Sequence, residues 1–228
     1  MRTFVLIFVA SLGMVALPSF AASLHGSLNL QTVNLNIVGG TLNFLPLADP
    51  TGIVDVGPGS TGSFSGASGP GTIADFAASP GPQSISAFLT ISAMPGVVFT
   101  LDSVNAGHFS SADCTMPAAP GQTCTPPGSI FNFVNQTPTT STASISVIGT
   151  VSDGSHDTPS AFVATFSVPI PLTFQDILAD FSAGRPVEAR AGSATFVVTA
   201  TPEPSSLLLA GMGLIFASFL VTHWRART

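Results

Sequence analysis

The chain has 228 residues, of which 7% are charged, against about 25% in ordinary soluble domains. Its 11 acidic residues face 5 basic ones, all arginine, which gives a net charge of −6 at pH 7. These figures exclude a nucleic-acid-binding protein and a charge-rich disordered chain, and the confinement of long apolar runs to the two ends excludes a multispan membrane protein.

The N-terminus has the pattern of a secretory signal peptide. Arg2 supplies a positive charge, residues 4–17 form an apolar stretch, and the small residues Ser19 and Ala21 predict cleavage after Ala21. An uncleaved membrane helix is the alternative, although the apolar run is short for one. We therefore expect the Sec export machinery to handle the chain and residues 1–21 to be removed.

Residues 22–200 are expected to form one extracellular β-rich domain. Short alternations of apolar and polar residues, separated by Gly, Pro and Ser, are typical of an antiparallel β-sandwich or barrel-like domain. The pattern predicts strands at 28–37, 41–47, 72–78, 85–92, 97–103, 129–134, 142–151, 160–168 and 192–200, with a loop at 57–71.

Three local features refine this prediction. A one-residue phase shift in the alternation near Thr32 indicates a β-bulge. Gly39-Gly40 and Asp153-Gly154 are each expected to form a hairpin turn.

One short helix is expected between an N-cap at Thr173 and a stop at Gly184 and Pro186. Its apolar residues recur at helical spacing and form one stripe: Phe174, Ile177, Leu178 and Phe181. We expect this helix to plug one end of the β-domain; a partner-binding helix is the alternative.

Cys114 and Cys124 are the only cysteines. An even pair in an exported chain predicts a disulfide, which would close a short loop rich in Pro and Gly. A metal role has little support, because no His or third Cys lies at ligand spacing nearby. The segment Asp153–Asp157 contains His156 between two carboxylates and is a weak candidate for a divalent ion, but a solvated turn fits it better.

The sequence indicates no catalytic residues and no cofactor. Gly62–Gly66 is similar to the Gly-x-Ser-x-Gly elbow of hydrolases, but its central residue is Phe64 rather than a nucleophile. The Gly-rich loop around it has no Lys, so it is not a phosphate-binding loop. Asp102 and Asp113 remain possible acids, with nothing in the sequence that marks them.

The C-terminal segment, 201–228, has three parts. Pro202, Glu203 and Pro204 come first, an uncharged apolar stretch at 207–221 follows, and Arg225 and Arg227 lie at the terminus. The stretch is just long enough for a transmembrane helix, and the arginines favour a cytoplasmic end. The domain before it would then lie outside the cell.

This tail resembles the PEP-CTERM sorting signal of Gram-negative bacteria. In that family a membrane protease, exosortase, recognises the tail, and the protein goes to the cell surface or an extracellular matrix such as a biofilm. The resemblance implies that Pro202, Glu203 and Pro204 are the recognition motif and Arg225 and Arg227 the cytoplasmic basic tail. A plain anchor that is never processed is the alternative.

The part of the chain before the tail, roughly 85–200, is more loosely similar to the extracellular domain of many PEP-CTERM proteins, including its Cys-x9-Cys loop. We therefore expect an exported, non-catalytic surface or matrix protein, held in the membrane before processing. The alternatives are an exopolysaccharide-binding module and a secreted hydrolase. Sugar-binding surfaces stack sugars on aromatic rings, and the chain has no Tyr and a single Trp, in the tail, so Phe would have to serve.

Overall fold

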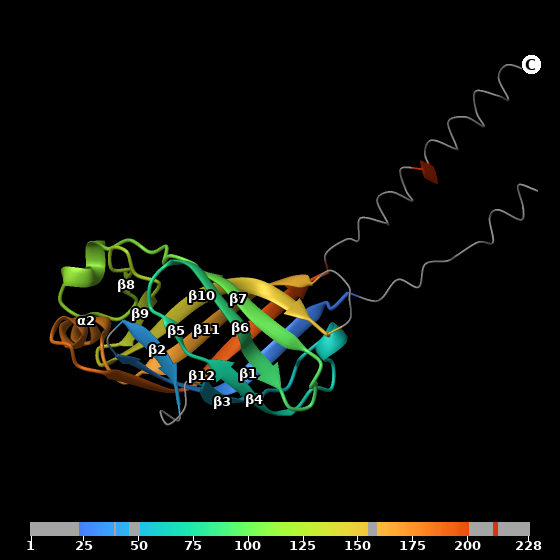
Figure 1. The fold of residues 1–228 in the computed structure, drawn as a ribbon. Coiled ribbons are helices and arrows are strands. Elements are labelled where there is room, and N and C mark those ends of the chain that lie inside the picture. Colours follow the sequence, from blue (N-terminus) through green and yellow to red (C-terminus); the bar gives the residue numbers. More distant parts are fainter. Residues whose placement is uncertain (1–22, 39, 46–50, 155–158, 201–211, 214–228) are drawn as a thin grey trace, which may run out of the picture.

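The computed structural model describes residues 23–38, 40–45, 51–154, 159–200 and 212–213. The domain within these ranges is almost entirely β-structure (Figure 1). Its strands are β1(Gly26–Val38), β2(Thr41–Phe44), β3(Thr51–Val56), β4(Gly69–Ala74), β5(Phe76–Ala77), β6(Gly81–Ile91), β7(Val98–Val104), β8(Thr123–Cys124), β9(Asn132–Thr137), β10(Thr140–Ser152), β11(Ser160–Ile170) and β12(Val187–Thr199). Its helical segments are the 3-10 turns η1(Gly62–Phe64) and η2(Ala112–Thr115) and the α-helix α2(Phe174–Ser182).

Eight of the strands close into an antiparallel barrel. Neighbours around the ring follow the chain in the order β1, β3, β4, β6, β7, β10, β11 and β12, and β12 pairs with β1 to complete it. This is an up-and-down meander, in which closure gives each strand a partner on both sides. The prediction of an antiparallel sandwich or barrel-like domain is thus confirmed, and the architecture is the barrel.

Two strands of the ring carry side branches. β1 pairs with β3 at Leu30 and Gln31 and with β2 at 35–38, and β2 pairs with β5. β10 pairs with β7 at 147–152 and with β9 at 140–144, and β9 pairs with β8. Both branches extend the wall at the same end of the barrel, where α2 also lies (Figure 1).

Phenylalanine fills the barrel. Eight rings, each at most 2% exposed, form one continuous set of contacts with centroids 5.3–6.5 Å apart: Phe44, Phe64, Phe76, Phe88, Phe99, Phe162, Phe166 and Phe196. An eight-stranded barrel is just wide enough for side chains to fill it. The interior is therefore a packed core.

Gly149 shows how tightly this core is packed. A Cβ at this position of β10 would overlap the carbonyl oxygen of Thr100 on β7 and the ring of Phe162 on β11. The register of β10 against β7 also shifts between Ile148 and Gly149. A glycine is needed where the wall of the barrel bends over an aromatic ring.

The bulge expected near Thr32 is present. Thr32 has a φ of 62°, and the register of β1 against β12 shifts between Gln31 and Val33. On β12, close to the same position, Ala191 has a φ of 58°. Both strands therefore depart from regular geometry together, which increases the local twist and helps a sheet to close.

The chain enters and leaves the barrel at one end. Gly26, at the start of β1, lies opposite Val198, near the end of β12. The loop after β3 closes this end by running along β1: Gly57 N, Thr61 N and Ser63 N donate to backbone oxygens of β1 and its preceding residue at 2.8 Å. Phe64, fully buried, packs its ring 5.9 Å from that of Phe99.

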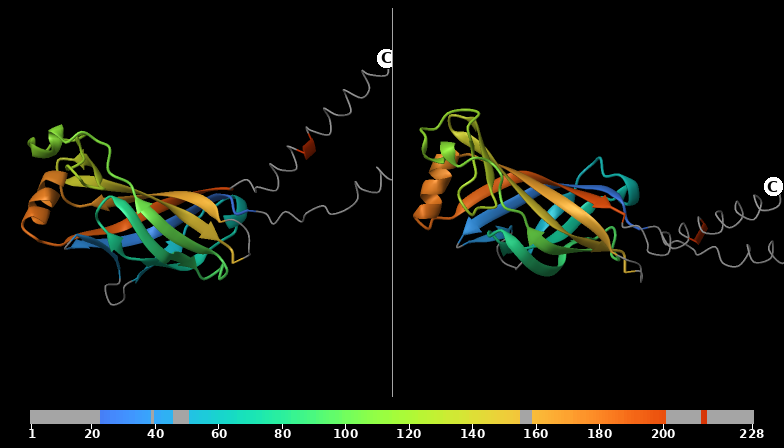
Figure 2. Two further views of the ribbon diagram at one scale, coloured as in Figure 1. Left: turned by 45° about the horizontal axis from the view of Figure 1, so that its top comes forward. Right: turned by 90° about the horizontal axis from the view of Figure 1, so that it is seen from above.

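The helix α2 closes the other end, as Figure 2 shows from two further directions. Thr173 is its N-cap: its Oγ1 accepts from the backbone N of Asp176 at 3.2 Å. Phe174 and Ile177 are fully buried, and the ring of Phe174 lies 6.5 Å from that of Phe133. The predicted cap, helix and plug are all confirmed, and Gly184, with a φ of 68°, follows the helix.

Most predicted strands agree with the structure to within a few residues, and β10 and β11 pair as the hairpin expected around Asp153-Gly154. β3 and the short β8 are not predicted by the sequence pattern, and the single strand predicted at 72–78 is instead two strands, β4 and β5, separated at Asp75 because β4 pairs with β6 and β5 with β2. Gly39, in the first predicted turn, lies outside the described residues, as do residues 155–158, which follow Asp153-Gly154.

Candidate functional site

The residues expected to direct sorting lie outside the described part of the chain. This applies to Ala21 and the signal peptide, to Pro202, Glu203 and Pro204, and to Arg225 and Arg227. Among the residues that are described, no helix is long and apolar enough to span a membrane. Of the stretch at 207–221, only residues 212–213 are among them.

The structure shows where these segments join the domain. β12 ends at Thr199, beside the start of β1, so the segments before β1 and after β12 attach at the same end of the barrel. The end closed by α2 is the opposite one (Figure 1). Any surface built by α2 and its neighbours therefore faces away from the attachment point.

The predicted disulfide is present at the α2 end. Cys114 in η2 and Cys124 in β8 are bonded, with their Cα atoms 5.1 Å apart. Cys124 is fully buried, whereas Cys114 packs at the edge of the core. The bond therefore ties the loop between these residues to β9 and the barrel wall.

A network of side-chain amides joins the same loop to α2. Asn135 on β9 is fully buried; its Oδ1 accepts from the backbone N of Phe174, and its Nδ2 donates to Oε1 of Gln175, both at 3.0 Å. Nε2 of Gln175 donates to Oε1 of Gln122 and to the carbonyl oxygen of Met116, each at 3.0 Å. Three elements that are distant in the sequence are thus held by hydrogen bonds without charge.

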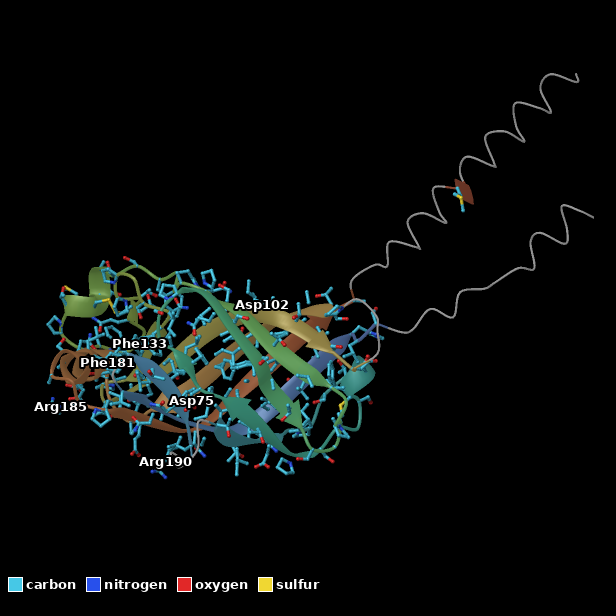
Figure 3. The ribbon with its side chains drawn as sticks, in the orientation of Figure 1. Asp75, Asp102, Phe133, Phe181, Arg185 and Arg190 are labelled. Carbon is cyan, nitrogen blue, oxygen red and sulfur yellow. A yellow bond between two sulfur atoms is a disulfide. The ribbon has the colours of Figure 1, made fainter. Side chains whose placement is uncertain are left out.

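A hollow of about 720 Å³ lies between α2, the loop before β9 and the turn after β1. Its walls are mostly apolar and include Val38, Phe131, Leu178 and Phe181. Figure 3 shows Phe133 and Phe181 together at this end, with Arg185 beyond them. Arg185 Nε donates to Oδ1 of Asp180 at 2.7 Å, so the cation at the rim is paired.

A second hollow, of about 520 Å³, lies where β10, β11 and β12 meet the same end. Glu188 and Arg190 line it and form an exposed ion pair at 3.0 Å. Ser141 also lines it, and its buried Oγ has no hydrogen-bond partner. Neither hollow contains an arrangement of acid, base and nucleophile.

The segment similar to a hydrolase elbow is structural. Phe64 at its centre points into the core, and the 3-10 turn around it closes the barrel. Asp113 accepts a 3.4 Å hydrogen bond from the backbone N of Thr123, and Asp102 is exposed on β7. The structure brings neither acid into a catalytic group.

Metal-binding candidates are equally limited within the described residues, where no group of three or more His, Cys, Asp or Glu side chains is close enough to hold an ion. Asp153 belongs to this part of the chain, whereas His156 and Asp157 fall outside it. The weak ion-binding candidate at Asp153–Asp157 therefore stays a prediction.

Asp75, between β4 and β5, is a titratable group that the sequence does not mark. Its Oδ1 accepts from the backbone N of Phe44 at 2.7 Å. Partial burial raises the pKa of this carboxyl, and the hydrogen bond from Phe44 opposes that shift. This hydrogen bond couples β2 to the turn before β5.

Comparison with known proteins identifies the tail. The PEP-CTERM protein-sorting motif matches residues 200–225, a range that contains Pro202, Glu203, Pro204 and Arg225. No curated protein and no solved structure matches the chain. The match does not extend into the barrel, so the looser resemblance of residues 85–200 stays a prediction. The motif implies export, membrane anchoring before processing, and processing by exosortase.

Proposed function

We propose that this chain, which carries a PEP-CTERM protein-sorting motif, is a non-catalytic protein of the cell surface or extracellular matrix. The motif at 200–225 is the observation that carries the proposal. In this view the signal peptide directs the chain to Sec, cleavage follows Ala21, and the tail holds the domain outside the membrane until exosortase acts on it.

The build of the domain supports a structural role. The barrel interior is filled by phenylalanine rather than shaped as a binding cup. The disulfide suits an oxidising compartment outside the cytoplasm. The α2 end, which carries the two hollows, is remote from the point where the tail begins, so it stays accessible in an anchored protein.

The aromatic side chains favour this role over polysaccharide binding. Sugar-binding surfaces commonly present exposed aromatic rings for stacking. Within the described residues no phenylalanine is fully exposed, and Phe109 and Phe181 are the two that are half-buried. A glycan array with the purified protein tests the alternative directly; tight, selective binding of one glycan would replace the structural role by a binding one.

The sorting proposal is tested by intact mass in two hosts, with and without exosortase. We expect the N-terminus at Ala22 in both hosts, and a C-terminus shortened only where exosortase is present. A variant with Pro202, Glu203 and Pro204 replaced by Ala should keep its tail in both hosts. Thr199→Ala, which lies just before the matched range 200–225, is the control and should be processed like the wild type. The same C-terminus in both hosts would refute processing.

A further inference from the structure

The outer surface of the barrel carries an apolar row across three adjacent strands. Ile148 on β10 pairs with Val163 on β11, which pairs with Val197 on β12. Their side chains are 37%, 48% and 54% exposed. These are among the few large apolar side chains exposed on the domain, and they lie side by side.

Neutral, mostly hydroxyl-bearing rows flank this apolar row. On one side lie Ser146, Thr165 and Thr195, and on the other Thr150, Ala161 and Thr199, again paired across β10, β11 and β12. We call these three rows together the neutral face. Figure 2 shows the three strands side by side along the barrel.

The neutral face contains no charged residue, and the few charges of the domain lie on other segments. β10 and β11 contain no charged residue, and β12 has only Glu188 and Arg190, both near its start. Between residues 22 and 202 the sequence holds 10 acidic and 2 basic residues, a net charge of −8. Two copies of this domain therefore repel each other in most orientations and least where their neutral faces meet.

We propose that the neutral face binds a second copy of this chain, with a two-fold axis near Val163. This axis superposes the apolar row of one copy on that of the other and places hydroxyl rows against hydroxyl rows. A hydroxyl group both donates and accepts hydrogen bonds, so such rows are complementary to themselves. A two-fold contact requires this self-complementarity, because each copy uses the same patch.

The area of the neutral face determines how strongly two copies are expected to bind each other. Three strands about 4.8 Å apart, over five residues of about 3.4 Å each, give a face of roughly 250 Å². Stable interfaces bury about 800 Å² on each partner. The pairing should therefore be weak and concentration-dependent, and favoured where copies are crowded on a surface. The proposed pairing does not depend on how the chain is sorted.

A cysteine placed near the axis tests the geometry. The two native cysteines are bonded to each other, so one added cysteine is the only free thiol. In the full-length chain exported by its host, Val163→Cys should give at least five times more disulfide-linked dimer on non-reducing gels than Ile53→Cys. Ile53 is 55% exposed on β3 and serves as the matched control. Equal cross-linking of the two variants would overturn the proposal.

Charge placed on the face tests the energetics. In sedimentation equilibrium of the purified full-length chain in detergent, Val163→Lys should weaken dimerisation at least tenfold, because the axis brings like charges together. Ile53→Lys should leave dimerisation unchanged. A wild-type chain that is monomeric up to millimolar concentration would refute the pairing. A further outcome would also overturn the pairing: the wild-type chain and Ile53→Lys are retained on dextran, but Val163→Lys is not. The face would then bind a neutral polysaccharide instead of a second copy.

Discussion

The two ends of the barrel are closed in different ways. The end where the chain enters and leaves is closed by backbone hydrogen bonds of the 57–63 loop and by one ring, Phe64. The α2 end is closed by a helix, a disulfide and the amide network of Gln122, Asn135 and Gln175. The first closure uses backbone groups of two segments, whereas the second combines a disulfide across 10 residues with amide hydrogen bonds that reach across 40 and 53 residues.

This difference has a physical reason. At the first end, β1 and the loop after β3 are already neighbours, so a few backbone bonds complete the wall. At the second end, the branches β2–β5 and β9–β8 do not pair with each other. Backbone bonds such as Gly121 N to Asn135 O hold the Cys114–Cys124 loop to β9, and side-chain amides then join that loop to α2. The hollow of about 720 Å³ lies at that mouth because the branches leave space that α2 does not fill.

The largest expected effect is on the end where the chain enters. Phe64→Ala should lower the free energy of unfolding by about 3–5 kcal/mol, because it leaves a cavity against Phe99. Urea denaturation of the purified chain measures this. The exposed Ile53→Ala should change stability by no more than about 0.5 kcal/mol. A similar small loss for both variants would mean that Phe64 does not seal the core.

Loss of the disulfide is the next largest effect and acts on the other end. Cys114→Ser with Cys124→Ser should cost about 2–3 kcal/mol, because the short loop between them is then free in the unfolded chain. Urea denaturation again gives the value, and hydrogen exchange should show faster opening of α2 than of β11. Uniformly faster exchange throughout the barrel would show that the two ends are not independent.

A smaller effect is expected at the start of α2. Thr173→Ala removes the acceptor for the backbone N of Asp176 and should cost about 1 kcal/mol in thermal or urea unfolding. Thr199→Ala, at the exposed end of β12, is the matched control and should be close to neutral. An equal loss in the two variants would contradict the role of Thr173 as a cap.

The smallest effect is a dependence on pH at Asp75. Because burial raises the pKa of this carboxyl in the folded chain, its protonated form favours folding, and that contribution is lost as pH rises through the folded pKa. Asp75→Asn keeps an oxygen acceptor for Phe44 but does not titrate. The Tm of the wild type relative to this variant should therefore be higher at pH 4 than at pH 7. The opposite trend would show that the hydrogen bond outweighs burial.

The sequence predicts elements whose signal is local. In β10 and β11 every second residue is buried and the residues between them are half-buried or exposed. α2 has both a cap and an apolar stripe, so all three elements follow from the printed residues. β3 escapes prediction because it is short and contains Gly52 and Asp55. Closure of the barrel also escapes it, since the pairing of β1 with β12 joins opposite ends of the domain.

The same distinction applies to function. The sorting motif is a contiguous pattern, so its residues can be predicted from the sequence alone. The amide network and the neutral face are not contiguous: Gln122, Asn135 and Gln175 come from three elements, and the row through Val163 exists only once three strands are in register. The roles of hydroxyl and amide side chains cannot be predicted from the sequence, because these roles arise only when the fold brings the side chains together.

The placement of β12 also determines how the domain bears mechanical load. A chain held through the residues after Thr199 is pulled along β12, which pairs with β1 from Gly26 to Ile37 and with β11 from Ala161 to Ser167. Hydrogen bonds of an antiparallel ladder lie perpendicular to the strands. Tension along β12 therefore shears both ladders at once instead of opening them bond by bond, so flow or traction on the anchored protein meets the resistance of two strand interfaces.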